Sequence, residues 1–124
     1  MPVVYLAGSL SLAALELLVH IDYHRALQEH YAMKVSFDPA LVLTVAEEKL
    51  PESWASANAV SATQALGDAW LRSNASVLLA VPSAIIPQEL NYLLNPRHPN
   101  AGRVAIGQPQ PFRFDRRLLK TEPI

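Results

Sequence analysis

The chain has 124 residues, of which 51% are hydrophobic and 17% charged, and its formal net charge is −1. This length and composition predict one folded domain and exclude a disordered chain, and the absence of cysteine excludes disulfides and thiolate chemistry. The net charge argues against direct nucleic-acid binding. No apolar run approaches the roughly 18 residues of a membrane span, and the first residues lack the basic start of a signal peptide. A cytoplasmic protein that does not contact the membrane is therefore expected.

The first half of the chain contains apolar runs bounded by turn residues. Serines before the Leu-rich run supply a helix cap, and Asp-Pro separates two later runs. The predicted elements are a buried strand over residues 2–7, a helix from Ser9 or Ser11 to about His30 with a break near Asp22, and strands over 34–37 and 40–45, the last one central in a sheet.

The second half is richer in proline, and seven of the ten prolines lie from Pro82 onward. Regular helices are therefore expected to be rare there. The predicted elements are a loop over residues 47–58, a helix over 61–72, a strand over 76–81, a short helix near 88–94, and strands over 104–106 and 111–114. The mixture predicts an α+β domain whose sheet is mixed or partly antiparallel.

Charge is unevenly distributed along the chain. From Arg97 onward the chain has six basic and two acidic residues, so this segment carries a net charge of +4. The preceding residues carry a net charge of −5. One interpretation is a solvated basic tail. The other is a surface that attracts an anionic ligand or an acidic partner.

Glu16 is the most unusual residue of the first helix. It lies in S-L-A-A-L-E-L-L-V-H-I, where nearly every neighbour is aliphatic. An unpaired carboxylate is costly to bury, so Glu16 either occupies a narrow exposed stripe or has a functional partner. The pattern alone leaves both interpretations open.

Two further polar features allow a structural and a chemical interpretation. Ser83 follows a predicted strand, where it either satisfies a turn or serves as a nucleophile, although the glycines of a nucleophile elbow are missing. His20 and His24 have the i, i+4 spacing of zinc ligands but lack the glutamate of H-E-x-x-H and an evident third ligand. Packing and surface roles for these histidines are favoured, and no metal site is predicted.

Four stretches of the chain resemble, in order, one protein family. They are P-V-V-Y-L-A-x-S-L-S-L-A-A-L-E-L-L-V-H, A-L-G-D-A-W-L, L-L-A-V-P-S-A-I-I-P-Q-E-L-N-Y-L-L-N-P-R-H-P and P-F-R-F-D-R-R-L. Together they cover nearly the whole chain, and the third is long and specific. The chain therefore resembles the RES domain family, which implies one RES domain over residues 1–124.

The resemblance carries expectations about fold, activity and partners. RES proteins resemble toxins of bacterial type II toxin–antitoxin systems, with a fold similar to ADP-ribosyltransferase toxins. The implied reaction is cleavage of the nicotinamide–ribose bond of NAD⁺, by hydrolysis, phosphorolysis or ADP-ribose transfer to a protein. NAD⁺ would be a substrate, with no permanently bound cofactor. The implied partner is an antitoxin with an Xre-type helix-turn-helix domain, and a homo-oligomer is compatible with the multimeric complexes of the family.

Three residues match the family's site by motif. Glu16 in S-L-A-A-L-E matches its glutamate, Ser83 in V-P-S-A its serine, and Tyr5 in V-V-Y a site tyrosine. The resemblance implies that all three are catalytic and that Tyr5 and Ser83 also bind NAD⁺. Glu16 would stabilise positive charge that develops on the ribose, Tyr5 would stack on or flank the nicotinamide, and Ser83 would hydrogen-bond the nicotinamide or ribose.

The chain departs from the family pattern before its first strand. Family members carry a segment resembling G-G-R-W-N there, whose arginine is a natural bidentate partner for the pyrophosphate of NAD⁺. No arginine of this chain has that context, so a chain truncated at its N-terminus, or a start further upstream, is expected. NAD⁺ binding would then be weaker by roughly 1.5–3 kcal/mol. The remaining candidates for that charge are Arg113, Arg116 and Arg117.

Two main hypotheses follow, with a weaker third. The chain is a toxin that depletes NAD⁺, or it is a catalytically inactive RES protein that only binds its antitoxin or self-associates. The third is a generic hydrolase that uses Ser83, which requires a histidine within reach.

Overall fold

The computed structural model describes residues 2–45 and 60–119, with residues 60–63 described by their backbone alone. Its centre is a four-stranded sheet, in which β1 and β4 form the two edges. Strands β1/β6 and β6/β5 pair antiparallel, and β5/β4 pair parallel, so the predicted α+β architecture with a mixed sheet is confirmed. In spatial order the strands are β1 (Val4–Ala7), β6 (Leu90–Leu94), β5 (Leu78–Pro82) and β4 (Val42–Thr44).

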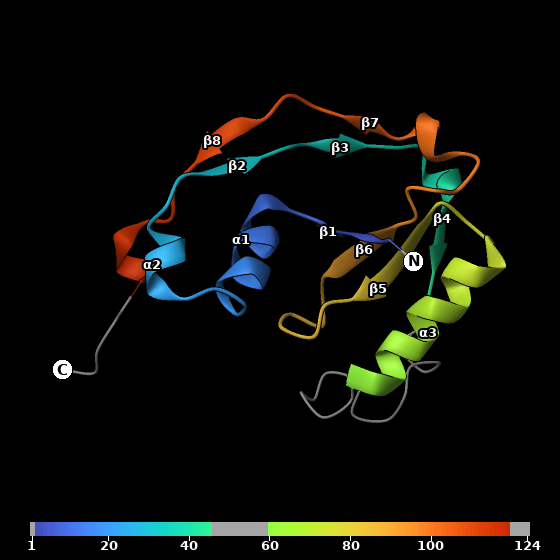
Figure 1. The fold of residues 1–124 in the computed structure, drawn as a ribbon, viewed down its shortest axis with the longest axis horizontal. Coiled ribbons are helices and arrows are strands. Elements are labelled where there is room, and N and C mark those ends of the chain that lie inside the picture. The colour runs from blue at the N-terminus through green and yellow to red at the C-terminus, as the bar shows by residue number, and fades with distance from the viewer. Residues whose placement is uncertain (1, 46–59, 120–124) are drawn as a thin grey trace.

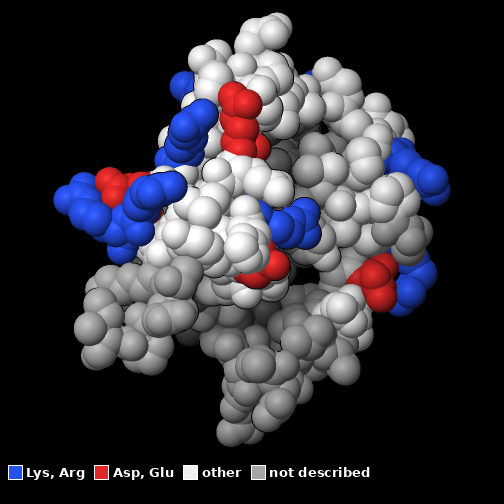
Figure 2. All heavy atoms as spheres, turned by 60° about the vertical axis from the view of Figure 1, so that its left-hand side comes forward, with Lys and Arg blue, Asp and Glu red and all other residues white. Residues whose placement is uncertain are grey.

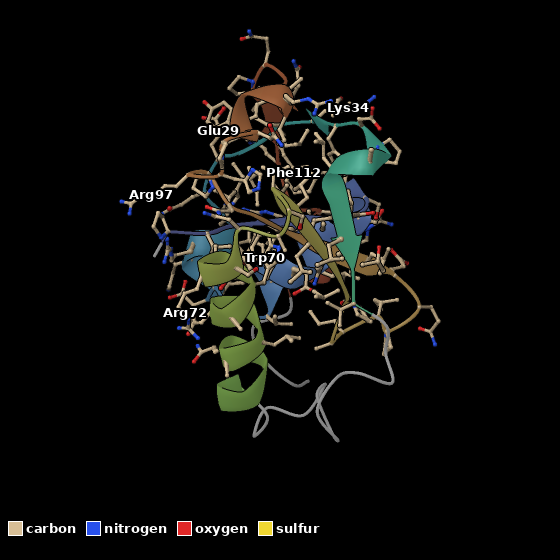
Figure 3. All side chains as sticks on the ribbon, turned by 90° about the vertical axis from the view of Figure 1, so that its right-hand side faces the viewer. Glu29, Lys34, Trp70, Arg72, Arg97 and Phe112 are labelled. Atoms are coloured by element: carbon tan, nitrogen blue, oxygen red, sulfur yellow. The ribbon has the colours of Figure 1, made fainter. Side chains whose placement is uncertain are left out.

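Helix α3 (Val60–Ser73) packs on one face of the sheet. Trp70 and Leu71 of this helix form a buried cluster with Leu79 of β5. In Figure 3, Trp70 lies between the helix and the strands, whereas Arg72 lies on the outer side. The indole N–H of Trp70 donates to Ser76 Oγ at 2.8 Å, which satisfies its only donor.

The opposite face of the sheet has its own buried cluster. Leu78 of β5 and Leu94 of β6 lie opposite each other in register, and both are buried. The cluster is completed by Leu41 and Val77 and by partly buried neighbours, which are Leu6, Phe37, Val42, Tyr92, Ala101 and Val104. Because alternate residues of a strand point to opposite faces, β5 and β6 contribute side chains to both clusters.

Two short helices lie between β1 and β2 in the chain. Helix α1 (Leu10–Leu18) begins at Ser9, whose side chain accepts from the Leu12 N–H at 3.1 Å. Helix α2 (Tyr23–Ala26) begins at Asp22, whose carboxylate accepts from the Arg25 N–H at 2.8 Å. Each cap satisfies a backbone donor that has no partner within the helix.

Two antiparallel ribbons form an arm beside α1 and the sheet, as Figure 1 shows. One pairs β2 (His30–Ala32) with β8 (Gln110–Phe112), and the other pairs β3 (Val35–Ser36) with β7 (Ala105–Ile106). Short 3₁₀ helices complete the described elements at Pro39–Leu41, Ala101–Arg103 and Arg116–Leu118. No helix in the described ranges is long and apolar enough to cross a membrane.

Several sequence predictions are confirmed. They are the strand after residue 2, the cap at Ser9, the helix break near Asp22, the strand that ends at Pro82 and the two late strands. The helix predicted over 61–72 is observed as α3, with similar bounds. The loop predicted over 47–58 lies outside the described residues.

Other predictions were wrong. The short helix near 88–94 is strand β6, because these residues pair on both sides with β1 and β5, and this pairing overrides local preference. The helical region ends at Ala26, and His30 begins a strand. β4 is an edge strand, and Leu43 is 47% exposed. β1 is also an edge strand, in which Tyr5 is 75% exposed, so it is not buried as predicted.

The edge position of β4 can be tested by truncating one leucine of the central strand β5 and one of β4 and comparing the losses of stability. Leu78→Ala should lower the free energy of unfolding by about 2–5 kcal/mol, because Leu78 is fully buried between β6 and β4. Leu43→Ala should lower it by only about 1 kcal/mol or less, because its side chain is half exposed. Urea unfolding of both variants measures the difference, and equal losses would contradict the observed strand order.

Candidate active site

Glu16 points from α1 toward the strand ends and is held there by two side chains. Its Oε1 accepts a hydrogen bond from Ser83 Oγ at 2.8 Å and a second from Asn91 Nδ2 at 2.7 Å. The partners lie 67 and 75 residues away in sequence, directly after β5 and at the second residue of β6. The carboxylate in the apolar helix is therefore half-buried and paired, and the exposed-stripe interpretation is wrong.

Ser83 is fully buried, and its hydroxyl and its backbone N–H both have hydrogen-bond partners. Its Oγ accepts from the N–H groups of Ile85 and Ile86, each at 3.1 Å, and its own N–H donates to the Glu89 carbonyl at 2.8 Å. The hydroxyl proton therefore goes to Glu16. The hydroxyl contacts no histidine within the described residues, so these residues do not supply the base that the serine-hydrolase hypothesis requires.

A cleft of about 540 Å³ opens beside Glu16. The strand register places five of its lining side chains on one face of the sheet, which are Tyr5, Asn91, Leu93, Leu79 and Val81. Val3, directly before β1, also lines the cleft. Helix α3 forms the opposite wall with Gly67 and Leu71, and Leu93 Cδ1 lies 3.8 Å from the place where a Cβ at Gly67 would stand. The exposed ring of Tyr5 and the carboxylate of Glu16 therefore border the same space, which matches the size of small-molecule sites.

Ser83 itself does not line this cleft. The structure brings Tyr5, Glu16 and Ser83 together, but it places Ser83 behind Glu16, in contact with the carboxylate. This arrangement suits a residue that holds Glu16 better than one that touches a ligand directly.

The described lining of the cleft contains acids but no lysine or arginine. Glu16 and Asp68 are its acidic residues, and His20 is its one histidine. The basic residues that the sequence offered as substitutes, Arg113, Arg116 and Arg117, are exposed and do not line it. An anionic group in this cleft would thus find no positive partner among the described lining residues.

The basic residues that the structure describes near the C-terminus lie on the exposed surface, outside the lining of the first cleft. The Arg117 side chain, and secondarily its backbone N–H, lower the pKa of the Asp115 carboxyl, and the two side chains form an exposed ion pair at 2.8 Å. On the face shown in Figure 2, charged side chains form separate groups divided by uncharged surface. On this face the lysine and arginine side chains do not form one continuous basic patch.

A second cleft, of about 790 Å³, lies between α1, β1 and the two ribbons. It shares Tyr5 with the first cleft, and among its lining residues in the described part of the chain Lys34 is the one lysine or arginine. Its other walls are largely apolar and include Leu10, Leu17 and Phe112.

Metal binding finds no support in the described parts of the chain. They contain no cluster of three or more histidine, aspartate or glutamate side chains that could hold an ion. Of the two histidines with zinc-like spacing, His20 lines the first cleft, whereas His24 lies in α2.

Asn91 is the site residue that sequence reasoning missed. The sequence predicts a short helix near 88–94, and this prediction gives no reason to place the Asn91 amide opposite Glu16. The available signal was the polar residue in L-N-Y-L-L, since a strand interpretation of this run puts Asn91 and Leu93 on one face.

Comparison with known proteins identifies the family of this chain. The RES domain model matches residues 1–115, so the chain belongs to the RES domain family. It is 39% identical over 116 residues to a protein named Toxin Res from Yersinia enterocolitica, covering 93% of this chain and 76% of that protein. It is 33% identical over 122 residues to the Prs ADP-ribosylating toxin of a Sphingobium species, covering 95% and 75%. It is 38% identical over 121 residues to a Toxin Res from Pseudomonas putida, covering 95% and 80%.

The hydrogen bonds of Ser83 predict a stability effect. Ser83→Ala should lower the free energy of unfolding by about 1–3 kcal/mol, because two backbone donors and Glu16 each lose a buried partner. The matched control is Ser11→Ala on the exposed side of α1, which should change it by no more than about 0.5 kcal/mol. Thermal or urea unfolding compares the pair, and a neutral Ser83→Ala would contradict the observed contacts.

Proposed function

We propose that this chain is the toxin of a bacterial type II toxin–antitoxin system and that it depletes NAD⁺ by cleaving the nicotinamide–ribose bond. The observation that carries the proposal is the Glu16 carboxylate, which borders a ligand-sized cleft with one oxygen held by two donors. Membership of the RES family and relatives named as toxins support it. One relative's name, Prs ADP-ribosylating toxin, points to ADP-ribose chemistry in that protein.

The chemistry requires a negative group beside the ribose. When the bond between ribose C1 and the nicotinamide nitrogen breaks, the electron pair leaves with nicotinamide and positive charge develops on the ribose. A fixed carboxylate stabilises this charge more in the transition state than in the ground state. Oε1 of Glu16 is occupied by Ser83 and Asn91, so Oε2 is the oxygen left to face the ribose or its hydroxyls.

The remaining steps follow from the acceptor. Water, phosphate or a protein side chain bonds to ribose C1 and loses a proton, which gives hydrolysis, phosphorolysis or ADP-ribose transfer, respectively. Tyr5 offers an exposed ring on the wall of the cleft, where it would stack on or flank the nicotinamide. Ser83 acts in this proposal by holding Glu16.

The pyrophosphate of NAD⁺ needs a positive partner that the first cleft does not offer among its described lining residues. A ligand that continues past Tyr5 enters the second cleft, where Lys34 is available. We therefore assign to Lys34 the contact with the phosphates. As a single point charge it would bind them less specifically than a bidentate arginine.

The described lining residues of the first cleft include no lysine or arginine, which also favours a second candidate function. In this alternative the chain is catalytically inactive and only binds its antitoxin or self-associates. A helix-turn-helix protein encoded beside this chain is the expected antitoxin of either candidate. Co-purification of the two proteins tests the partner, and failure to associate contradicts the antitoxin that both candidates assign, which leaves self-association as the surviving form of the second.

The first test of the proposed activity is the loss of NAD⁺ over time. The purified chain should release nicotinamide, and Glu16→Ala should slow this release by about 100-fold or more, because the developing charge loses its stabilising partner. Glu29→Ala, which removes an exposed glutamate of the same charge, should leave the rate unchanged. Chromatography with and without added phosphate or protein distinguishes the three acceptors. Equal rates for Glu16→Ala and the unaltered chain would exclude Glu16 as the catalytic carboxylate.

Lys34 gives a separate test of substrate binding. Lys34→Ala should raise KM for NAD⁺ about tenfold and change kcat little, because a phosphate contact is made equally in the ground and transition states. Arg72→Ala, on the outer side of α3, removes an exposed positive charge that lines neither cleft and should leave KM unchanged. Steady-state kinetics at constant ionic strength measures both, and an unchanged KM for Lys34→Ala contradicts the assignment.

A further inference from the structure

Asn91 sits inside the sheet, where a polar amide is unexpected. It lies in β6 between two paired strands, opposite Ala7 of β1 and Val81 of β5. Its Nδ2 donates to Glu16 Oε1 at 2.7 Å, which is the shorter of the two hydrogen bonds that this oxygen accepts. The strand neighbours that share its face, Leu93 and Val81, are aliphatic.

The other end of the amide has no partner. Oδ1 of Asn91 is buried and accepts no hydrogen bond in the described parts of the chain. An unpaired buried acceptor destabilises the folded state, and asparagine is a poor strand residue. Packing and strand preference would thus favour an aliphatic side chain here, so the stability of the sheet does not explain Asn91.

We infer that Asn91 is a positioning residue for Glu16, and this inference rests on the proposed function. A single hydrogen bond from Ser83 would leave the carboxylate free to turn about that contact. A second donor from a different strand fixes its orientation, so that Oε1 is occupied and Oε2 remains for the ligand. Asn91 thus orients the carboxylate that meets the ribose, whereas its Oδ1 makes no contact in the described residues that would explain an amide at this position.

The chain offers a matched control in Asn95, at the end of the same strand. Asn95 is also buried, but both ends of its amide are used. Its Nδ2 donates to Asn74 Oδ1 at 3.1 Å, and its Oδ1 accepts from the Arg97 N–H at 3.0 Å. It does not line the cleft of Glu16, so it represents a buried asparagine with a purely structural role.

The experiment compares Asn91→Leu with Asn95→Leu in the full chain. Asn91→Leu should lower kcat for NAD⁺ cleavage about tenfold or more with little change in KM, because orientation of Glu16 matters most in the transition state. Its unfolding temperature should stay within a few degrees of the unaltered chain or rise. Asn95→Leu should show the reverse, with a lower unfolding temperature and an unchanged kcat per folded molecule. An unchanged kcat in Asn91→Leu would overturn the inference.

A double-mutant cycle on stability tests the contact independently of activity. In the unaltered background Asn91→Leu removes an unpaired acceptor and also a donor to Glu16. In a Glu16→Ala background Nδ2 has also lost its partner, so Asn91→Leu removes only unpaired groups and should raise the unfolding temperature more. If the chain cleaves no NAD⁺, the proposed function fails while this cycle still decides the inference. Equal shifts in the two backgrounds would show that Asn91 acts on the sheet alone and would overturn it.

Discussion

The hydrogen bonds to Glu16 Oε1 connect three parts of the protein that are distant in sequence. They join α1 to the residue that follows β5 and to β6, across 67 and 75 residues. A half-buried carboxylate is tolerated in an otherwise apolar helix because two donors compensate for its lost hydration. The position of α1, the turn after β5 and the bordering cleft all depend on this small polar network.

The surrounding fold makes this network rigid. Ser83 cannot rotate freely, because Ile85 and Ile86 donate to its hydroxyl from the turn that connects β5 to β6. Asn91 belongs to a strand that is paired on both sides, so its amide is placed by the sheet. A charged group held by residues with fixed orientations requires little reorganisation when charge develops nearby, which is the property that electrostatic catalysis requires.

Stability and function make different demands on this part of the sheet. The aliphatic residues of β5 and β6 fill two buried clusters, one on each face. On the face of α3, this packing gives way near Glu16 to a cleft lined by Gly67, Tyr5 and Asn91. The cleft carries two acids and, among its described lining residues, no lysine or arginine, whereas Lys34 lies in the adjoining cleft beyond Tyr5. The proposed substrate, with a cationic nicotinamide at one end and phosphates further along, has the same order of charges.

The sequence by itself determined three local features, which are the Ser9 cap, the helix break near Asp22 and the strand before Ser83. These features follow from the sequence because caps, turns and apolar runs depend on only a few neighbouring residues. Motif resemblance also identified Glu16, Ser83 and Tyr5 as a candidate site. Only the tertiary structure decided that 88–94 contains a strand, that β4 and β1 lie at the edges of the sheet, and that Asn91 reaches Glu16. These outcomes depend on which segments pair across many residues, and strand partners are selected by burial and hydrogen bonding in the assembled sheet.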